Sequence, residues 1–339
     1  MRFPLADFLD AHRDCRHNLG ESGMHGTLPP PPAPARTRGR EVLDDLREEL
    51  ARSIGIPPDR LTLTHGATEA NAWVTFYLRR GTGVRRPSCR VRLPEYPPLF
   101  EVAQAAGFRL VEDQQRAQLA VVSRPRNPEG DLWDRSRLLA WAEGAPQLLV
   151  DETFREFADA RSLARGGDRG IWVSGSFTKF YGADDLRVGY VIAPPEEAER
   201  FGRFAGLVLD ELSPASAAGA LTLLRRRTAV RREVRRVLDR NLAVLAAADP
   251  TSPRPVGPVY FDRSVTDADR LVDRCLEASV LVTPGRFFGE PGGVRIGLTR
   301  RSFPKDLDAY LRIRRQFAPG RLRAPANGRG ARRRRGGAG

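Results

Sequence analysis

The sequence predicts an α/β fold, with a large domain built on a mostly parallel sheet flanked by helices and a smaller α/β domain. Three observations predict it. Short apolar runs alternate with helical patterns between residues 61 and 194. A strongly helical stretch follows over 195–250, and a second, shorter set of apolar runs lies within 259–299. Alternating strands and helices are typical of parallel sheets, because each helix returns the chain to the start of the next strand.

The N-terminal part comes first. Residues 1–18 are expected to form a short amphipathic helix. A loop with a proline run follows over 18–39, and such runs form neither helices nor central strands. The next helix starts at Glu41, because leucines then recur at three- and four-residue steps, and it ends at Gly55 and the prolines after it.

The alternating part and the C-terminal part supply the remaining elements. Strands are expected at 61–65, 89–94, 119–125, 147–152, 170–177 and 188–194. The helices between them are expected at 67–80, 98–107 and 135–144. Three further strands are expected near 259–262, 279–284 and 294–299, between two helices. The basic run at 225–241 carries an apolar stripe and is expected to be a solvated helix.

These elements predict a division of the chain. We expect residues 40–235 to form the large domain, and residues 1–39 and 236–319 to form the small domain together. Residues 320–339 are expected to be a disordered tail rich in arginine and glycine, because they contain too few apolar residues to build a core.

The composition limits the possible partners. The 339 residues carry a net charge of +14, and the tail supplies half of it, with seven arginines and no acid. We therefore do not expect nucleic acid as a partner, although weak contacts of the tail with anions or RNA stay an alternative. No apolar run is long enough to span a membrane, and the N-terminus does not read as a secretory signal.

Three widely spaced cysteines predict no disulfide framework and a cytoplasmic location. His12, Cys15 and His17 form a small cluster of metal-binding residue types, but no further ligand cluster accompanies them, so we predict no metal site.

Lysine is nearly absent from this chain. Of 56 lysines and arginines, only Lys179 and Lys305 are lysine. An amine can lose its proton and attack a carbonyl, whereas a guanidinium stays protonated. Ser176 lies three residues before Lys179, and Arg187 lies eight residues after it. These three groups suit a phosphorylated aldehyde, with lysine for a Schiff base and the other two for the phosphate. Lys305 lies in an expected surface helix and has no expected catalytic role.

Further features follow expected strands, where ligands bind in open α/β sheets. The turn Gly66-Ala67-Thr68 opens a helix, and helix N-termini bind phosphate. Asp151 follows four apolar residues, so its carboxylate is expected to be partly buried and to need a cation. A simple helix cap would also explain the turn, and a structural ion pair would also explain Asp151.

Two more features are weaker when taken alone. Tyr96 is held rigidly by neighbouring prolines and can stack on a flat ring, although packing would explain it equally well. Asn127 begins an Asn-Pro-x-Gly turn, which is common in proteins. The order of all these features along the chain is a stronger signal than any one of them.

Together the motifs resemble the fold-type-I pyridoxal 5′-phosphate (PLP) enzymes of aminotransferase class I/II, such as histidinol-phosphate and aspartate aminotransferases. The family's Ser-x-x-Lys with arginine at plus eight is matched at 176–187, its Asn-Pro-x-Gly at 127–130 and its Asp-Glu-x-aromatic at 151–154. Arg295, in a late Arg-Ile-Gly-Leu, matches the family's carboxylate-binding arginine. The resemblance implies the PLP-transferase fold, and an enzyme that moves an amino group between an α-amino acid and a 2-oxo acid.

The resemblance also implies roles around the cofactor ring. Lys179 is expected to form the Schiff base with PLP and then to move protons. Asp151 is expected to pair with the pyridinium nitrogen, Asn127 to hydrogen-bond the 3′-oxygen, and Tyr96 to stack on the ring. The expected phosphate ligands are Gly66, Ala67, Thr68, Ser176 and Arg187.

Substrate contacts and the assembly are implied in the same way. Arg295 is expected to clamp the α-carboxylate, and the stretch 18–23, with Gly20, to pass over the substrate. The family builds its active site at a dimer interface, so we expect a homodimer.

Two departures from the family leave the reaction open. Phe154 stands where many aminotransferases carry a tyrosine that hydrogen-bonds the 3′-oxygen of PLP. Decarboxylases and cyclising enzymes of the same fold also accept phenylalanine here, so a PLP-dependent decarboxylase, lyase or cyclase is the alternative. The loop before the first large-domain helix has no tyrosine to reach the phosphate of a partner subunit.

Overall fold

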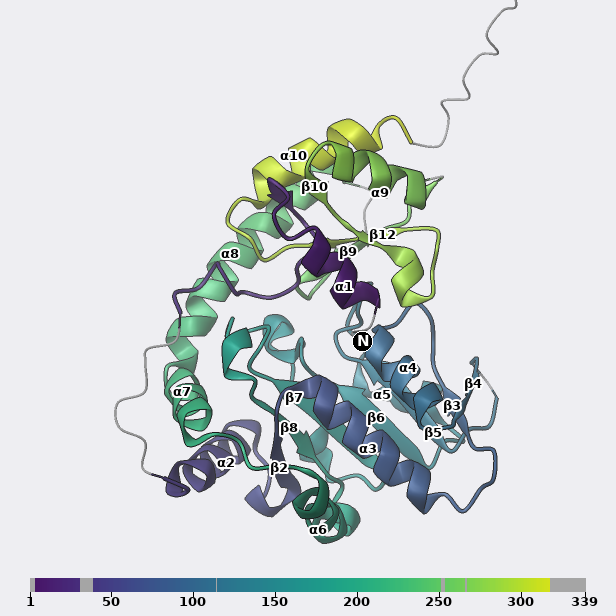
Figure 1. Cartoon of the computed structure of the whole chain (residues 1–339), viewed down its shortest axis with the longest axis vertical. Helices are drawn as coiled ribbons and strands as arrows, with labels where there is room; N and C mark the ends of the chain where they lie inside the picture. The colour runs from purple at the N-terminus through teal and green to yellow at the C-terminus, as the bar shows by residue number, and fades with distance from the viewer. Residues whose placement is uncertain (1–3, 31–38, 114, 251–253, 266, 318–339) are drawn as a thin grey trace, which may run out of the picture.

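A computed structural model describes residues 4–30, 39–113, 115–250, 254–265 and 267–317 (Figure 1). A seven-stranded sheet and its helices occupy the lower part of the molecule in this view. Two small sheets and the helices beside them occupy the upper part, and helix α8 (Arg227–Ala248) runs along one side from the lower part to the upper part. The predicted tail lies outside the described residues.

The large sheet has the spatial order β2-β8-β7-β6-β5-β3-β4. Its strands are β2 (Leu61–Thr64), β3 (Ser88–Arg90), β4 (Arg109–Val111), β5 (Leu119–Ser123), β6 (Gln147–Asp151), β7 (Ile171–Ser176) and β8 (Gly189–Ile192). Strands β7, β6, β5, β3 and β4 run parallel, whereas β8 is antiparallel to both β7 and β2. The predicted mostly parallel sheet is confirmed.

Helices cover both faces of this sheet. One face packs against α3 (Ala67–Gly81), α4 (Pro97–Ala105) and α6 (Ala198–Val208). The other packs against α2 (Glu41–Ile54), α5 (Arg135–Ala142) and α7 (Pro214–Arg225). Successive strand residues point to opposite faces, so Val121 belongs to the first core and Val122 to the second. Burial on both faces explains the unbroken apolar runs in the sequence.

The upper part contains two smaller sheets. The strands β11 (Thr283–Pro284), β12 (Val294–Gly297) and β9 (Val259–Asp262) form an antiparallel sheet in that order. Strand β1 (His17–Asn18) pairs in parallel with β10 (Val280–Leu281). The N-terminal segment is therefore held against the C-terminal part of the chain.

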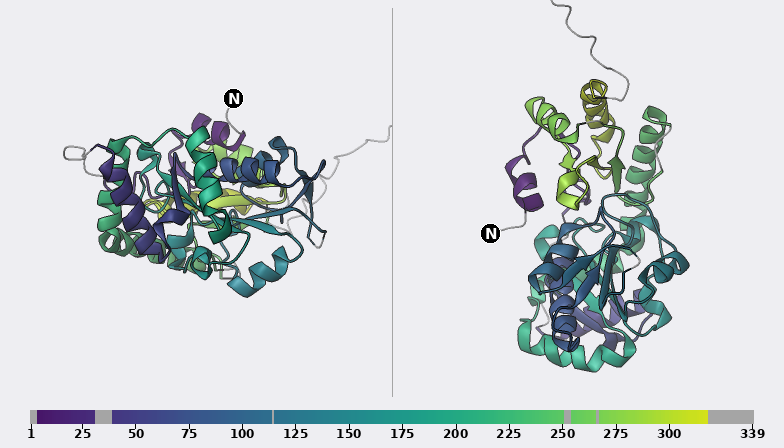
Figure 2. Two further views of the ribbon diagram at one scale, coloured as in Figure 1. Left: turned by 90° about the horizontal axis from the view of Figure 1, so that it is seen from below. Right: turned by 90° about the vertical axis from the view of Figure 1, so that its right-hand side faces the viewer.

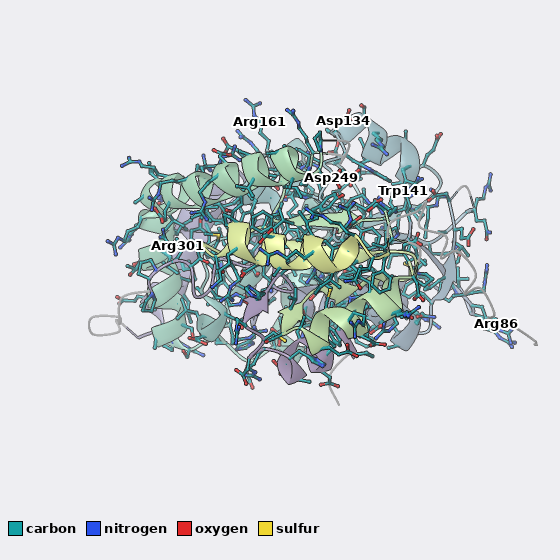
Figure 3. The ribbon with its side chains drawn as sticks, turned by 90° about the horizontal axis from the view of Figure 1, so that it is seen from above. Arg86, Asp134, Trp141, Arg161, Asp249 and Arg301 are labelled. Atoms are coloured by element: carbon teal, nitrogen blue, oxygen red, sulfur yellow. The ribbon has the colours of Figure 1, made fainter. Side chains whose placement is uncertain are left out.

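Three helices cover these sheets. They are α8 (Arg227–Ala248), α9 (Ala268–Glu277) and α10 (Phe303–Arg314). Viewed from above, α10 lies between α8 and α9 (Figure 3). Helix α1 (Pro4–Ala11) lies beside the small sheets, next to the N-terminus (Figure 2, right).

Short 3₁₀ helices complete the described structure. They are η1 (Pro58–Arg60), η2 (Arg155–Ala158), η3 (Leu163–Gly166), η4 (Asp184–Leu186), η5 (Pro195–Glu197) and η6 (Gly285–Phe288).

The predicted helix over 1–18 was wrong in extent. Helix α1 ends at Ala11, and the backbone N–H groups of His17 and Leu19 donate to the carbonyls of Ser279 and Leu281 instead. Pairing with a distant strand therefore overrides the local helical pattern. The strand predicted at 89–94 ends at Arg90, and the sequence did not predict β4, whose three residues are too few to show a period.

Candidate active site

A cavity of about 430 Å³ lies at the carboxyl ends of the central strands. Strands β5, β6 and β7 end side by side, at Ser123, Asp151 and Ser176, because they are parallel neighbours. The predicted site residues that line the cavity are Ala67, Thr68, Tyr96, Asn127, Asp151, Ser176, Lys179, Arg187 and Arg295. Gly20 and Gly66 lie just behind the wall.

Lys179 lies three residues after the end of β7. Its backbone carbonyl accepts a hydrogen bond from the N–H of Met24 at 2.8 Å, so the N-terminal loop passes directly over it. Within the described residues its amine forms no ion pair. Burial lowers the pKa of Lys179, partly offset by the charges of Asp184 and Glu21. An amine with a lowered pKa is more often uncharged at neutral pH and is a better nucleophile.

Asp151, at the end of β6, is a buried carboxylate without a cationic partner among the described residues. Its Oδ2 accepts from Asn71 Nδ2 at 2.9 Å, and its Oδ1 accepts from the backbone N–H of Thr153 at 2.9 Å. The hydroxyl of Ser174 donates to Asn71 Oδ1 at 2.6 Å and fixes that amide. Burial raises the pKa of Asp151, and the hydrogen bonds of Thr153 and Asn71 oppose the rise.

The N-terminus of α3 and Arg187 form one end of the cavity. Gly66, the N-cap of α3, has a φ of +99° and no side chain caps the helix. A Cβ on Gly66 would lie 3.3 Å from Arg187 Nη2, so glycine leaves the space beside that guanidinium open. Arg187 is half exposed and pairs with Asp184 at 2.9 Å. Helix N–H groups and a guanidinium beside them form a site for a phosphate.

Tyr96 and Asn127 line the walls between these groups. The Tyr96 hydroxyl lies in hydrogen-bond contact with Thr68, and burial raises the pKa of Tyr96 to about 12. Phe154 also lines the cavity, packed edge-on against Phe157 with 6.0 Å between the ring centroids. No hydroxyl therefore comes from position 154.

Arg295, on β12, is a buried guanidinium that faces the cavity from the other side. Its Nη2 donates to the carbonyl of Gly20 at 2.6 Å, and its Nη1 donates to Asn127 Oδ1 at 3.2 Å. The guanidinium lies over the ring of Phe288, 5.0 Å from its centroid. Burial lowers the pKa of Arg295 to about 10. No carboxylate of the described residues pairs with it, and its Nε is buried without a hydrogen-bond partner.

The predicted role of Gly20 takes a different form in the structure. Gly20 holds Arg295 through its carbonyl, while the next two residues, Glu21 and Ser22, line the cavity. A Cβ on Gly20 would lie 2.8 Å from the side chain of Leu281, which explains why glycine fits here. The predicted passage of 18–23 along the cavity is consistent with this arrangement.

The N-terminal segment also supplies wall residues that the sequence did not predict. From α1 and the following turn these are Leu5, Ala6, Leu9, Asp10 and Arg13. His25 lines the cavity too, and its Nε2 lies 2.9 Å from Glu21 Oε2, which also accepts from Arg300 at 3.1 Å. Burial alone would raise the pKa of Glu21, but His25 and Arg300 lower it to about 2.

Asn71 was also missed, although the sequence holds a signal for it. It lies on the buried side of α3, next to the core positions Ala70 and Val74. A polar residue on the apolar face of a helix needs a buried partner, and here the partner is Asp151.

These residues fit PLP. The cavity offers a phosphate site at one end, an unpaired amine, and a buried carboxylate that lacks a cation. The protonated ring nitrogen of PLP would supply that cation, and its aldehyde would suit the amine. The fold and this set of groups define a PLP-dependent enzyme of fold type I.

Comparisons with known proteins agree. Residues 35–302 match the model of the family described as aminotransferase class I and II. The chain belongs to this family, and it is an enzyme whose cofactor is pyridoxal 5′-phosphate.

Individual relatives have several activities. A capreomycidine synthase from Streptomyces vinaceus is 30% identical, over 87% of this chain and 89% of its own. An aromatic amino acid aminotransferase from Mycolicibacterium smegmatis is 30% identical, over 81% of each chain. A solved histidinol-phosphate aminotransferase from Sinorhizobium meliloti, in complex with pyridoxal 5′-phosphate, has the same fold. Its TM-score is 0.73 at 19% identity, and the match covers 93% of this chain and 95% of that one.

Two other features bear on partners. Within the described ranges, no helix has the length and apolar character needed to cross a membrane. The same part of the chain has no group of three or more His, Cys, Asp or Glu side chains placed to hold a metal ion. His17 instead bonds Asp306 at 2.9 Å.

Proposed function

We propose that this protein is an aminotransferase that exchanges an amino group between an α-amino acid and a 2-oxo acid, with Lys179 as its catalytic residue. One observation carries the proposal. A buried carboxylate, Asp151, and a buried guanidinium, Arg295, face the same cavity as Lys179, and neither has an oppositely charged partner among the described residues. Unpaired buried charges are costly. A cationic cofactor ring and an anionic substrate would offset the two costs.

The proposed roles of the polar groups follow from their chemistry. PLP, when bound, supplies an electron-accepting ring that stabilises negative charge at the substrate α-carbon. Asp151 keeps the ring nitrogen protonated, and Asn71 holds the Asp151 carboxylate in place. Lys179 removes a proton from the α-carbon and returns it, and its lowered pKa suits both steps. Arg295 orients the substrate by its α-carboxylate.

The remaining site residues are proposed to bind the cofactor and to enclose the substrate. Gly66, Ala67 and Thr68, with Ser176 and Arg187, are proposed to hold the phosphate. Tyr96 is proposed to cover one face of the ring, and Asn127 to bond its 3′-oxygen. The N-terminal segment around Gly20 is proposed to exclude water from the substrate.

A second candidate is a PLP-dependent decarboxylation, lyase or cyclisation reaction on an amino acid. Phe154 favours it, because the cavity wall has no hydroxyl at this position to bond the 3′-oxygen. The similarity to a capreomycidine synthase, over most of both chains, favours it too. Release of carbon dioxide, or of a rearranged amino acid, without formation of a 2-oxo acid would identify this reaction.

We also propose a homodimer in the cytoplasm. The apolar side chains of Phe76 on α3 and Leu207 on α6 are exposed, at 42% and 83%, on neighbouring helices. Burial of both side chains in a subunit interface would remove their apolar surface from water. The loop expected to lack a phosphate-binding tyrosine falls partly at 31–38, outside the described residues. A monomeric mass in solution at full activity would contradict the dimer.

A division into two domains is part of the proposal, with residues 40–235 as the large domain and 1–39 with 236–319 as the small one. The pairing of β1 with β10 supports it, because this pairing ties the first segment to the last. Helix α8 passes through the proposed boundary without a break.

Absorption spectroscopy tests the function. Purified protein reconstituted with PLP should show the visible band of lysine-bound PLP, and Lys179→Ala should lose it. Lys305→Ala is the matched control and should keep it. A screen of α-amino acids for loss of that band, followed by detection of 2-oxo acids, separates the two candidates. Persistence of the band in Lys179→Ala would refute the assignment.

A further inference from the structure

Glu95 lies behind the cavity, in the loop between β3 and α4. Its side chain is completely enclosed, with 0% exposed, and it does not line the cavity. Its backbone N–H donates to the carbonyl of Phe288 at 3.0 Å. A carboxylate in such a place is costly unless several donors satisfy it. The hydrogen-bond donors to Glu95 belong to Tyr96 and Ser123. Tyr96 is a proposed cofactor contact, and Ser123 lies four residues before another, Asn127.

The hydrogen bonds of Glu95 form a network with two arms, and the first arm leads to Tyr96. Glu95 Oε1 accepts a hydrogen bond from the backbone N–H of Tyr96 at 2.6 Å. This N–H begins helix α4, where Tyr96 is the N-cap and no side chain of its own caps the helix. The bond therefore fixes the backbone from which the Tyr96 ring enters the cavity wall.

The other arm leads to Asn127 through Ser123. Glu95 Oε2 accepts from the backbone N–H of Ser123 at 2.9 Å, and the Ser123 hydroxyl donates to Glu95 Oε1. The same hydroxyl oxygen accepts from the backbone N–H of Asn127 at 2.8 Å. A serine hydroxyl has one proton, so donating it to Glu95 leaves its lone pairs for Asn127. A charged Glu95 thus makes the Ser123 hydroxyl a donor toward Glu95 and an acceptor toward Asn127.

We propose that Glu95 is a positioning residue, a single buried carboxylate that fixes Tyr96 and Asn127 relative to each other and so presets the walls of the PLP site. This inference rests on the proposed function. The network reaches the substrate side as well, because Asn127 Oδ1 accepts from Arg295 and the Phe288 ring lies under the same guanidinium.

Among the described residues, Arg126 is the cation that acts on Glu95. The guanidinium of Arg126 is buried beside it and donates to the carbonyls of Arg92 and Pro94, at 3.0 and 2.8 Å. Arg126 also pairs with Glu129. Burial raises the pKa of Glu95 to about 7, although the charge of Arg126 and the bonds of Ser123 and Tyr96 lower it. Protonation in the neutral range would leave the Ser123 hydroxyl without its anionic acceptor.

Two substitutions test the network, each through the affinity of the apoprotein for PLP, measured by fluorescence titration. Glu95→Gln keeps the volume but replaces one acceptor oxygen by a donor, and should weaken PLP binding by roughly tenfold or more. Ser123→Ala removes only the hydroxyl that connects Glu95 with Asn127, and it should weaken PLP binding by a smaller factor. Glu101→Gln, on α4 and outside the cavity wall, is the matched control and should bind like the wild type.

The double variant Glu95→Gln/Ser123→Ala distinguishes a network from separate effects. It should bind PLP no more weakly than Glu95→Gln alone, because both changes break the same connection. The pH midpoint of the visible band should also move in Glu95→Gln and stay in Glu101→Gln. Wild-type affinity in folded Glu95→Gln, or fully additive losses of affinity in the double variant, would overturn the proposal.

The outcomes separate this inference from the proposed function. If the wild type fails to bind PLP, the proposed function is wrong. If the wild type binds PLP and folded Glu95→Gln binds it equally well, only the role of Glu95 is wrong. Thermal unfolding of each apoprotein establishes folding. If Glu95→Gln does not fold, the PLP affinity of Ser123→Ala, compared with that of the control Glu101→Gln, decides the question.

Discussion

Asn127 Oδ1 accepts a hydrogen bond from Arg295 Nη1 at 3.2 Å. Asn127 follows β5 of the large sheet, and Arg295 lies on β12 of a small sheet, so this bond joins the two across the cavity. One residue is proposed to bind the cofactor and the other the substrate. The bond therefore links a proposed cofactor-binding side chain directly to a proposed substrate-binding side chain.

Arg295→Lys should separate substrate binding from cofactor binding. Lysine keeps a positive charge but cannot form the two parallel bonds of a guanidinium. We expect KM for the amino acid to rise by roughly tenfold to a hundredfold, the loss of one charge-assisted hydrogen bond, with PLP affinity nearly unchanged. Steady-state kinetics measure it. Arg286→Lys, on the exposed side of η6, is the control, and an unchanged KM in Arg295→Lys would contradict a carboxylate clamp.

Asp151→Asn should lose activity without losing stability. Burial raises the pKa of Asp151, so its stabilising contribution is complete below the ordinary aspartate pKa, near 4, and is lost as the pH rises through the folded value. At neutral pH the apoprotein of the variant should therefore be at least as stable as the wild type. The Asn71 amide can turn over to accept from Asn at 151, because Ser174 can accept as well as donate.

Activity of Asp151→Asn should fall by roughly 10²- to 10³-fold, the cost of losing a preorganised charge partner. Thermal unfolding of the apoprotein between pH 4 and pH 8 and the rate with a reactive amino acid measure the two effects. Asp159→Asn, an exposed aspartate paired with Arg231, serves as control. A variant that is active but unstable would show Asp151 to be a structural residue.

Phe154→Tyr tests the departure from the family. The ring lines the cavity, so an added hydroxyl has space and can bond the cofactor's 3′-oxygen. That bond favours the deprotonated form of lysine-bound PLP. The pH midpoint of its visible band should fall, by about one unit. A spectroscopic pH titration measures the midpoint, with Phe76→Tyr outside the cavity as control. An unmoved midpoint would show that position 154 does not reach the 3′-oxygen.

Uptake of PLP should depend on pH through Lys179. Only the uncharged amine attacks an aldehyde. Because burial lowers the pKa of Lys179, the uncharged fraction is complete at a lower pH than for a free lysine. The rate of uptake by the apoprotein should rise with pH, and the midpoint of the rise should lie below pH 10.5, the ordinary lysine value. Stopped-flow absorbance follows this rate, and a midpoint at or above that pH would contradict a lowered pKa.

The gathering of the large-sheet residues in one cavity could be predicted from the sequence, and the reason is geometric. Asn127 and Lys179 follow β5 and β7, and Asp151 is the last residue of β6, so all three lie at the edge where these parallel strands end. A local pattern together with strand order therefore places three distant residues in one cavity. The strand patterns were clear because these strands are buried on both faces.

The N-terminal contribution was much harder to predict. Leu9, Glu21 and His25 reach the cavity only because β1 pairs with β10, more than 250 residues later. A strand of two residues, such as β1, is too short to show a period in the sequence, so a helix over 1–18 was predicted instead. Glu95 was missed for a different reason. An acidic residue in a proline-rich loop is ordinarily exposed to solvent, so nothing in the sequence indicated that this side chain is buried.

The pairing of the first segment with the last also sets an order of events during synthesis. Leu19 donates to the carbonyl of Leu281 and accepts from the N–H of Gly297, so its partners are made long after Leu19 itself. Until residue 297 has left the ribosome, the segment over Lys179 has no strand to hold it and Arg295 has no carbonyl from Gly20 to bind. Between the synthesis of Lys179 and that of Gly297, the nascent chain therefore carries an uncovered lysine and phosphate site, and the active site can be enclosed only after residue 297 has emerged.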